Sequence, residues 1–348
     1  MKKTLIALAA VAVTGVASAQ VTLSGKYAFA YQSTTTAAGV TTKGGETTDG
    51  DIVFAATEDL GGGMSISASS ALRLRGRTPG STDGRDASMT LSGGFGKVMI
   101  GSIEAGNGIL GLGGAGAPVI GLDSSAKTLS GAGNIDLIRY YTPELAPGLT
   151  AYISSIEGVV GAGGSTSAST QVGVSYSAGA LKVSGDVVNY ATGAAAAAVN
   201  GLCAATGATA LSALASATAT CAGTVVQAYT PAVTLAAYAD QQTRISASYN
   251  LGVATVGLGY QLRSFQDGGA TGDNKQTVVG LSAPVGNMTV GVLFATQKQG
   301  TTIDKSGTEI GVNYAMSKRT NLQIANQSYK SGTAASAKAT RVRLMHSF

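Results

Sequence analysis

Apolar and polar residues alternate with a period of two along much of the chain. In the first clear segment, Val21, Leu23, Tyr27, Phe29 and Tyr31 share one side, and Thr, Ser, Lys and Ala residues occupy the other. Successive side chains of a β-strand point to opposite faces, so this pattern predicts a strand with one apolar face. The segment also has about the 9–11 residues that a tilted strand needs to cross a bilayer.

The same alternation returns throughout the sequence. Its apolar positions are Met64-Ile66-Ala68, Ala87-Met89-Leu91, Val172-Val174-Tyr176, Ile245-Ala247-Tyr249, Val256-Leu258-Tyr260, Val290-Val292-Phe294, Ile310-Val312-Tyr314 and Val342-Leu344-His346-Phe348. Seven short turn signals rich in Gly, Asn or Pro separate these segments. They alternate with eight longer connections near residues 33–50, 78–84, 104–134, 158–168, 193–241, 265–275, 298–306 and 331–338. Fifteen connections predict sixteen strands.

Alternating short turns and long loops are typical of a transmembrane antiparallel β-barrel, with short periplasmic turns and long external loops. Closing the sheet removes the unpaired strand edges that lipid would not tolerate. The alternative is a secreted soluble β-protein, such as a sandwich or a solenoid. A sandwich would usually have strands of about 5–6 residues, and a solenoid would show a fixed repeat, which the sequence lacks. The sequence therefore favours a single all-β barrel domain.

Composition supports this class of fold. The 348 residues include 50 Gly, 44% hydrophobic residues and only 12% charged residues. Disordered chains are charge-rich and apolar-poor, and coiled coils do not tolerate so much Gly. After the N-terminal segment, no run of 18 residues is continuously apolar, which disfavours a bundle of membrane-spanning helices.

The first 19 residues resemble a secretory signal peptide. Met1-Lys2-Lys3 is a basic start, Thr4 to Val16 is an apolar run, and Ala17-Ser18-Ala19 is a small-residue cleavage site. The alternative is a membrane anchor, but the apolar run is too short to span a bilayer. We therefore expect a signal peptide over 1–19 and a barrel domain over 20–348. Removing two lysines lowers the net charge from +5 to 5 − 2 = +3.

Export would place the two cysteines, Cys203 and Cys221, in a compartment where they can form a disulfide. Metal ligation is the alternative, but no His or CxxC pair lies nearby. A bridge of this loop size would stabilise the fold by about 3 kcal/mol in the chain-entropy model. The cysteines lie in the connection 193–241, where Ala194 to Ala198, followed by Leu202, Leu211 and Leu214, suggest a short helix in a surface loop.

Several motifs together resemble the Gram-negative trimeric porin family, in its general-diffusion, anion-preferring sixteen-stranded branch. They are Val21-Thr22-Leu23-Ser24-Gly25, Thr57 to Gly63, Arg85 to Gly96, Asn134 to Pro143 and the terminal Met345-His346-Ser347-Phe348. The resemblance covers essentially the whole exported chain. It implies a homotrimer in the outer membrane of a Gram-negative bacterium, surrounded by lipid and lipopolysaccharide. It also implies a water-filled channel for passive diffusion of small anionic or neutral hydrophilic solutes.

The resemblance has two further implications for individual segments. Phe348, at the end of the last apolar alternation, would belong to the signal that outer-membrane assembly machinery recognises. The third loop, here 104–134, would fold into the lumen and narrow it. Glu104 and Asp123 are acids of this expected constriction loop. So few acids would give the loop little preference for cations.

Arginines are the candidate selectivity residues. Arg73, Arg75 and Arg77 follow at a spacing of two and oppose the apolar positions from Met64 to Leu74. A charge on the lipid face costs about 2–4 kcal/mol at the membrane midplane, so these side chains are expected in the lumen. They would form a positive ladder that attracts anions. The alternative is that they are rim charges near a loop.

The resemblance adds two arginines to this set. Arg139 matches a constriction-wall arginine, and alternation agrees, because Ile138 and Tyr140 would face outward. Arg85 matches an arginine at the top of the fourth strand. Two arginines usual in the family are missing, since Ile52-Val53-Phe54 and Gly101-Ser102 stand in their places. Arg73 and Arg75, on a neighbouring strand, would supply the positive electrostatic field of the two missing arginines.

Enzymatic interpretations find no support in the sequence. His346 is the single histidine and alternates with lipid-facing residues, so no Ser/His or Asp/His catalytic set can form. A GxGxxG match at Gly111, Gly113 and Gly116 lacks the following helix that a dinucleotide site needs. No cofactor, metal or nucleic acid is expected. The functional alternative to a channel is a barrel with a structural or adhesive role and a lumen closed by its loops.

Overall fold

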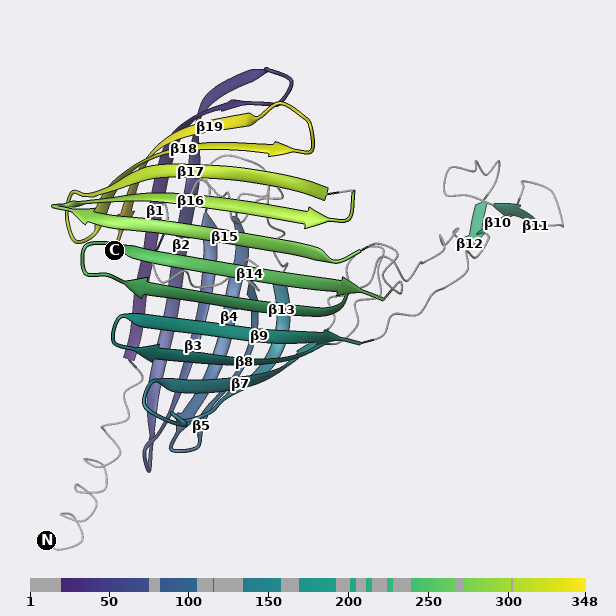
Figure 1. The fold of residues 1–348 in the computed structure, drawn as a ribbon. Coiled ribbons are helices and arrows are strands. Elements are labelled where there is room, and N and C mark those ends of the chain that lie inside the picture. Colours follow the sequence, from purple (N-terminus) through teal and green to yellow (C-terminus); the bar gives the residue numbers. More distant parts are fainter. Residues whose placement is uncertain are drawn as a thin grey trace, which may run out of the picture.

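The protein is a closed antiparallel β-barrel of sixteen strands (Figure 1). The computed structural model describes residues 20–74, 82–104, 115, 134–157, 169–191, 201–204, 211–214, 224–227, 239–266, 272–301 and 303–348. The predicted fold class and the predicted number of barrel strands are confirmed. No helix among the described residues is long and apolar enough to cross a membrane.

The barrel strands follow one another around the ring in chain order. The first nine are β1 (Gln20–Thr35), β2 (Thr41–Gly61), β3 (Met64–Leu74), β4 (Thr82–Gly93), β5 (Gly96–Glu104), β6 (Asn134–Tyr141), β7 (Leu149–Glu157), β8 (Ser169–Ala178) and β9 (Leu181–Tyr190). The others are β13 (Ala239–Asn250), β14 (Thr255–Phe265), β15 (Asn274–Val285), β16 (Met288–Gln299), β17 (Ile303–Ala315), β18 (Thr320–Ser331) and β19 (Ala337–Ser347).

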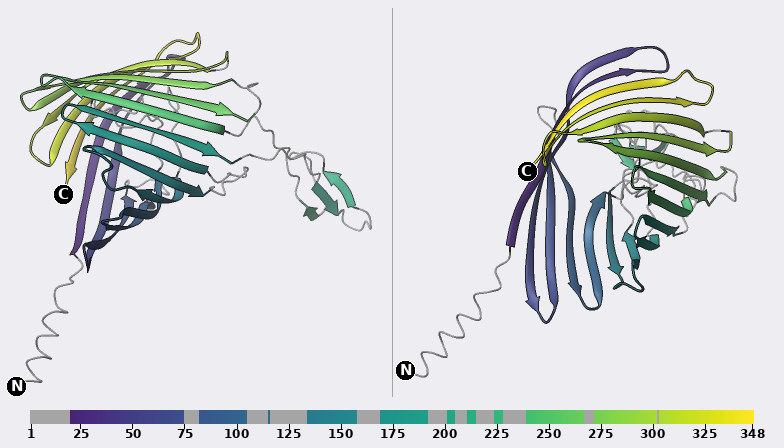
Figure 2. Two further views of the ribbon diagram at one scale, coloured as in Figure 1. Left: turned by 60° about the horizontal axis from the view of Figure 1, so that its bottom comes forward. Right: turned by 60° about the vertical axis from the view of Figure 1, so that its left-hand side comes forward.

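The ring closes between the first and last strands. β1 pairs with β19 in a register that sets Lys26 opposite Ser347 and Thr35 opposite Lys338. In both views of Figure 2 the purple β1 runs beside the yellow β19. The closure leaves no barrel strand with a free edge, as lipid requires.

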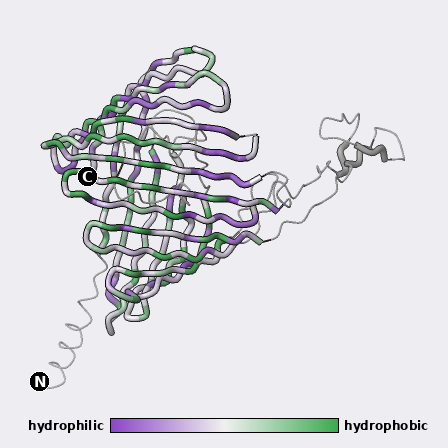
Figure 3. The backbone as a smooth tube through the Cα atoms, viewed as in Figure 1, coloured by the Kyte–Doolittle hydropathy of each residue, from purple (hydrophilic) through white to green (hydrophobic). Residues whose placement is uncertain are grey.

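Burial is inverted relative to a soluble protein. On β8, the outward-facing Val172 and Val174 are 48% and 50% exposed, whereas the inward-facing Gln171 is only 3% exposed. Polar side chains such as Gln261 and Gln327 are fully buried on the inner face. Figure 3 shows the hydrophobic positions along the strands and the more hydrophilic strand ends next to the long connections. An apolar exterior and a polar interior are typical of a transmembrane barrel.

Glycine forms the tight turns. Gly62 and Gly63, between β2 and β3, have φ values of 61° and 77°, and Gly286, between β15 and β16, has a φ of 60°. This left-handed backbone is unfavourable for residues with a Cβ atom. Glycine therefore supplies the positive φ values that these two short connections, predicted from the sequence, require.

Two sequence expectations about connections are wrong. Residues 33–50 were expected to form a long loop, but β1 and β2 stay paired as far as Thr35 and Thr41, whose hydroxyls are 2.9 Å apart. Thr favours strands, and the backbone pairing continues through the glycines of this segment. The connection expected over 298–306 is also short, because β16 ends at Gln299 and β17 begins at Ile303.

The helix expected in the connection 193–241 is also contradicted in part. Leu202, Leu211 and the residues near them belong to a separate three-stranded sheet of β10 (Gly201–Ala204), β11 (Leu211–Leu214) and β12 (Thr224–Gln227). Antiparallel backbone pairing sets Leu202 opposite Ala213 and satisfies the hydrogen-bonding groups that a helix would satisfy within itself. Ala194 to Ala198 lie outside the described residues.

Candidate functional site: the charged inner walls

The first charged group on the inner face, here called the far-wall cluster, contains Arg139, Asp186, Arg244 and Arg263. They come from β6, β9, β13 and β14. Each occupies an inward position of a strand whose neighbouring residues face outward, as Arg244 does beside Ile245, which is 52% exposed. The period-two alternation of these strands therefore places the charges inside the barrel.

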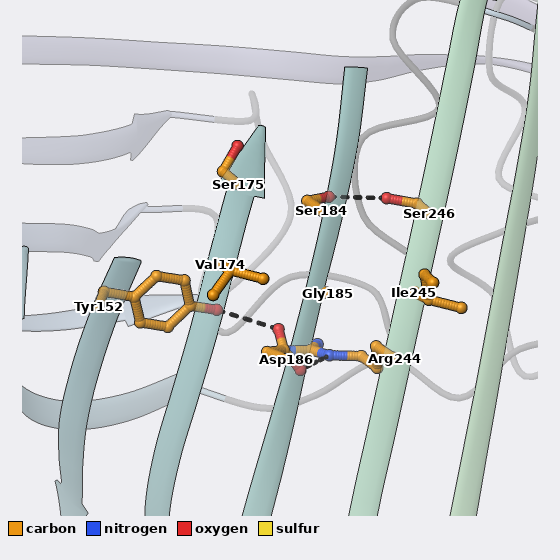
Figure 4. A pocket seen from close by; sticks show the side chains of 9 residues that line it. All are labelled: Tyr152, Val174, Ser175, Ser184, Gly185, Asp186, Arg244, Ile245 and Ser246. Carbon is orange, nitrogen blue, oxygen red and sulfur yellow. Dashed lines mark hydrogen bonds and ion pairs between the residues drawn. The ribbon is translucent and has the colours of Figure 1, made fainter. Parts of the chain in front are cut away.

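Asp186 and Arg244 form the centre of the far-wall cluster (Figure 4). The Nε and Nη2 atoms of Arg244 donate hydrogen bonds of 2.8 Å to the two carboxylate oxygens of Asp186. The side chains are 9% and 4% exposed. Tyr152 donates a 3.0 Å hydrogen bond to the same carboxylate, and Gln171 donates one of 3.1 Å. This two-point contact with additional donors fixes the geometry of the buried pair.

Arg139 is held by neutral groups. Its Nε donates to Ser154 at 2.7 Å, and its Nη2 donates to Gln171 at 2.9 Å. Its Nη1 donates to the hydroxyl of Tyr141 at 3.1 Å, and its guanidinium lies 4.6 Å from the ring centroid of Tyr152. No carboxylate among the described residues lies within 4.0 Å of it. The charge of Arg139 is therefore fixed in position without being neutralised.

Gly173 makes this arrangement possible. A Cβ atom on Gly173 would lie 2.3 Å from Cζ of Tyr152, far inside van der Waals contact. The Tyr152 ring therefore occupies the space over Gly173, its cross-strand partner. From there it reaches both Asp186 and the guanidinium of Arg139.

Arg263 completes the far-wall cluster. Its Nε and Nη2 atoms donate to the Oε1 of Gln242 at 3.0 and 2.5 Å, so it too is held by a neutral side chain. Three arginines and one aspartate give the cluster a formal charge of 3 − 1 = +2.

A small cavity of about 110 Å³ adjoins the Asp186–Arg244 pair (Figure 4). Its lining residues are Tyr152, Val174, Ser175, Ser184, Gly185, Asp186, Arg244, Ile245 and Ser246. The hydroxyls of Ser184 and Ser246 are 2.8 Å apart. The cavity has room for a few water molecules, whereas sites for small organic ligands usually measure about 300–1,000 Å³. We therefore interpret the cavity as a small space within the barrel wall and not as a binding site for an organic ligand.

The second charged group lies around the closure of the barrel and is here called the seam cluster. Its members are Lys26, Glu46, Asp49, Asp51, Arg73, Arg85, Arg341 and Arg343. Asp51 is the shared acceptor: Arg85, Lys26 and Arg73 approach its carboxylate at 3.1, 3.6 and 3.8 Å. This acid, on β2, thus joins cations from three other strands.

The β19 arginines extend the seam cluster. Arg343 lies 3.1 Å from Asp49 and donates a 2.7 Å hydrogen bond to Gln323. Arg341 lies 3.4 Å from Glu46 and donates a 2.6 Å hydrogen bond to Gln32. Five cations and three carboxylates give this cluster a formal charge of 5 − 3 = +2.

The two clusters lie on opposite parts of the ring. The seam cluster comes from β19 and β1–β4, whereas the far-wall cluster and its polar contacts come from β6–β9, β13 and β14. Figure 1 shows β7–β9, β13 and β14 in front and β1–β5 behind them. An excess of positive charge therefore faces the interior from both sides.

The structure divides the arginines predicted from sequence between two walls. Arg73 and Arg85 lie in the seam cluster, and Arg139 lies in the far-wall cluster. Arg75 and Arg77 lie outside the described residues, as do Asp123 and Cys221. Glu104 ends β5 and Cys203 lies in β10, but their side chains are not described. The disulfide and the constriction loop stay predictions.

The sequence analysis did not select several charged residues of the inner face as candidate site residues. They are Lys26, Asp49, Asp51, Asp186, Arg244, Arg263, Arg341 and Arg343. The signal was present, because Arg341 and Arg343 alternate with the outward-facing Val342 and Leu344. The described residues contain no group of three or more His, Cys, Asp or Glu side chains that could hold a metal ion.

A closed sixteen-stranded barrel with an apolar exterior and a charged interior defines a transmembrane channel of the outer-membrane type. Residues 4–334 match the model of the Gram-negative porin family. The chain belongs to this family, whose members form channels for passive diffusion. The protein is therefore a channel for passive diffusion in the outer membrane.

Solved structures with the same fold include an anion-selective porin from Comamonas acidovorans. It is 21% identical, with a TM-score of 0.66 over 95% of this chain and 100% of that chain. OmpT, an outer membrane protein of Vibrio cholerae, is 12% identical, with a TM-score of 0.60 over 95% and 98%. A triple mutant of the Rhodopseudomonas blastica porin is 13% identical, with a TM-score of 0.60 over 94% and 100%. No curated protein matched the chain.

Proposed function

We propose that this porin conducts small hydrophilic solutes with a preference for anions. Arg139 carries the proposal, because it faces the interior with neutral partners and without a carboxylate within 4.0 Å among the described residues. The positive excess of both clusters supports it, since fixed charges on the walls raise the local concentration of counter-ions. The similar fold of the anion-selective Comamonas acidovorans porin agrees with it.

Other parts of the proposal rest on the sequence and the family. We propose that residues 1–19 are a signal peptide, that the exported chain forms a homotrimer, and that the connection after Glu104 narrows the lumen. Arg75 and Arg77 would add to the positive inner face, and Cys203 and Cys221 would close the connection after β9. The channel would act without a cofactor or a catalytic step.

Substitution of Arg139 tests the selectivity proposal. Arg139→Gln should lower the ratio of anion to cation permeability about two- to three-fold. A unit charge about 6 Å from a passing ion in water contributes roughly 0.7 kcal/mol before salt screening. The measurement is the zero-current potential across a planar bilayer in a salt gradient. Arg319→Gln, in an exposed turn between β17 and β18, removes the same charge away from the clusters and should change the ratio little. An unchanged ratio in Arg139→Gln would exclude a role for this arginine.

A further inference from the structure

Five inward-facing side chains lie side by side on β5, β6 and β7. They are here called the tyrosine patch and consist of Lys97, Met99, Arg139, Tyr141 and Tyr152. Strand register sets Met99 directly opposite Arg139, and it sets Tyr141 between Lys97 and Tyr152. Residues two apart on a strand share a face, so each β5 member lies on the same side of the barrel wall as its β6 neighbour. The tyrosine patch therefore faces the lumen, as the far-wall cluster does.

The two tyrosine rings and the Arg139 guanidinium are in contact. The ring centroids of Tyr141 and Tyr152 are 5.8 Å apart, with their planes tilted by 51°. The guanidinium carbon of Arg139 lies 4.6 Å from the Tyr152 centroid and 5.6 Å from the Tyr141 centroid. Tyr152 is enclosed, because its ring lies between Gly173 and Arg139. Tyr141, which is partly exposed, is therefore the ring that a solute in the lumen can contact.

Arg139 keeps hydrogen-bonding capacity for a solute. A guanidinium carries five N–H donors. In the described part of the chain Arg139 uses three of them, one each from Nε, Nη1 and Nη2, toward Ser154, Tyr141 and Gln171. One N–H on Nη1 and one on Nη2 remain, and the side chain is partly exposed. An anion that passes the patch can therefore accept hydrogen bonds from a guanidinium that is already held in place.

Strand β5 adds a second cation and an apolar side chain. Lys97 is exposed, lies directly opposite Tyr141, and has no carboxylate within 4.0 Å in the described strands and turns. Met99, opposite Arg139, is partly exposed, and a thioether makes favourable contacts with aromatic rings. The ring of Tyr141 thus has two cations and an apolar side chain as neighbours. An aromatic cation would be repelled by both charges, whereas an aromatic anion would be attracted by both.

We propose that the tyrosine patch is a weak binding site for aromatic carboxylates that pass through the channel. The carboxylate would accept hydrogen bonds from the two remaining N–H groups of Arg139, and the aromatic ring would pack against Tyr141 and Met99. Lys97 would attract the same anion from the short-turn end of the barrel. Weak binding is compatible with conduction, since a solute must also leave the site. The proposal rests on the anion preference proposed above and adds a class of solute to it.

Comparison with Arg263 shows what the tyrosine patch adds to a fixed charge. Arg263 is also held by a neutral side chain, Gln242, and has no described carboxylate within 4.0 Å. Its guanidinium makes no cation–π contact with a described ring, however, whereas that of Arg139 contacts two. Attraction by Arg263 therefore depends on charge and does not distinguish two carboxylates of similar size. Discrimination between an aromatic and a non-aromatic carboxylate would identify the patch.

Block of the chloride current by benzoate and by cyclohexanecarboxylate tests the proposal. The two anions carry the same carboxylate and rings of similar size, but only benzoate is aromatic. In planar bilayers at pH 8, benzoate should halve the chloride conductance of the wild-type channel at a concentration about two- to three-fold lower, because an aromatic pair strengthens a contact beyond the area that it buries. Tyr141→Leu should remove this difference. The matched control is Tyr140→Leu, the same change at the neighbouring outward position, which should keep it.

Folding and charge are tested separately. Heat-modifiable migration of Tyr141→Leu would show that the barrel has formed, and Tyr141→Phe, which keeps the ring, should keep the preference for benzoate. Arg139→Gln should raise the half-blocking concentrations of both anions, since both lose the carboxylate contact.

Equal half-blocking concentrations of the two anions in the wild type would overturn the proposal. An unchanged difference in folded Tyr141→Leu, or its loss in Tyr140→Leu, would overturn it as well. The sign of the zero-current potential in KCl is a separate measurement. A wild-type channel that prefers chloride but does not distinguish the two acids would therefore overturn this proposal alone and leave the proposed anion preference unaffected.

Discussion

At the residue scale, two arginines of the far-wall cluster, Arg139 and Arg263, are fixed by the hydrogen bonds that they donate to neutral groups. Arg139 has Ser154, Gln171 and Tyr141 as acceptors, and Gly173 gives Tyr152 the space to lie beside it. Only Arg244 of the far-wall cluster has a carboxylate within 4.0 Å among the described residues. Fixed guanidinium groups with neutral partners keep their field for a passing ion, whereas a paired one contributes a weak dipole.

Asp186→Asn is predicted to increase anion preference, because it releases the charge of Arg244. We expect the ratio of anion to cation permeability to rise about two-fold, measured as a zero-current potential. The barrel should also lose about 1–3 kcal/mol in its free energy of unfolding, since Arg244 would lose its carboxylate. Lower anion preference in a correctly folded Asp186→Asn channel would contradict this role of the pair.

Residue-scale prediction from sequence was only partly possible. Alternation with outward-facing neighbours was enough to place Arg73 and Arg139 on the inner face. It also applied to Arg341 and Arg343, but no family motif drew attention to them. The contacts of Arg139 with Gln171 on β8 could not be predicted, because they depend on the register of three strands.

At the element scale, the pairing of β1 with β19 completes the barrel. The last residue participates directly: Phe348 and Gly25 exchange backbone hydrogen bonds of 3.0 and 3.1 Å. The Phe348 ring stacks with Tyr27 at a centroid distance of 6.2 Å and covers Gly25, where a Cβ atom would lie 2.6 Å from the ring. Arg343 and Asp49 join β19 to β2 across β1 on the inner side. The seam is thus held on both faces.

Phe348→Ala is predicted to weaken this seam. Loss of the aromatic pair and its buried area should lower the free energy of unfolding by about 1–3 kcal/mol, measured by urea unfolding in lipid vesicles. Phe95→Ala is the matched control, because Phe95 lies in a turn and is 41% exposed, against 40% for Phe348. Equal decreases in the free energy of unfolding of the two variants would show that Phe348 stabilises the seam no more than Phe95 stabilises its turn. A lower yield of exported Phe348→Ala would in addition support its role as an assembly signal.

The strands were more predictable than their connections. The period-two alternation and the turn residues were enough to predict the sixteen barrel strands. The expected connections 104–134 and 158–168 agree within one residue with the ends of β5 and β7 and the starts of β6 and β8. The β1–β2 hairpin was misplaced because its Thr- and Gly-rich residues resemble a loop when no apolar alternation marks them. The small sheet of β10–β12 was missed because Ala-rich segments favour a helix by propensity alone.

At the scale of the whole molecule, the apolar residues form an outer band and the charges gather inside and beyond it. This distribution explains how a chain with 44% hydrophobic residues needs no conventional core. It also places twelve charged side chains of the described strands in two inner clusters that face the pathway.

A charge on each face of one strand tests this distribution. Val174→Lys places a charge in lipid and should lower the free energy of unfolding by up to about 2–4 kcal/mol, depending on depth. The neighbouring Ser175→Lys places it on the inner face and should cost less than half as much. Urea unfolding in lipid vesicles gives both values. A greater loss from Ser175→Lys would reverse the assignment of inside and outside.

The most direct test of the central claim is the zero-current potential of the wild-type channel in a tenfold KCl gradient. Excess positive charge on both inner walls predicts a stable conducting channel whose potential has the sign set by chloride, between zero and the limit of about 59 mV for perfect selectivity. Adding salt should reduce it, because the charges are screened. A potential with the sign set by potassium would contradict the claim that these arginines determine selectivity.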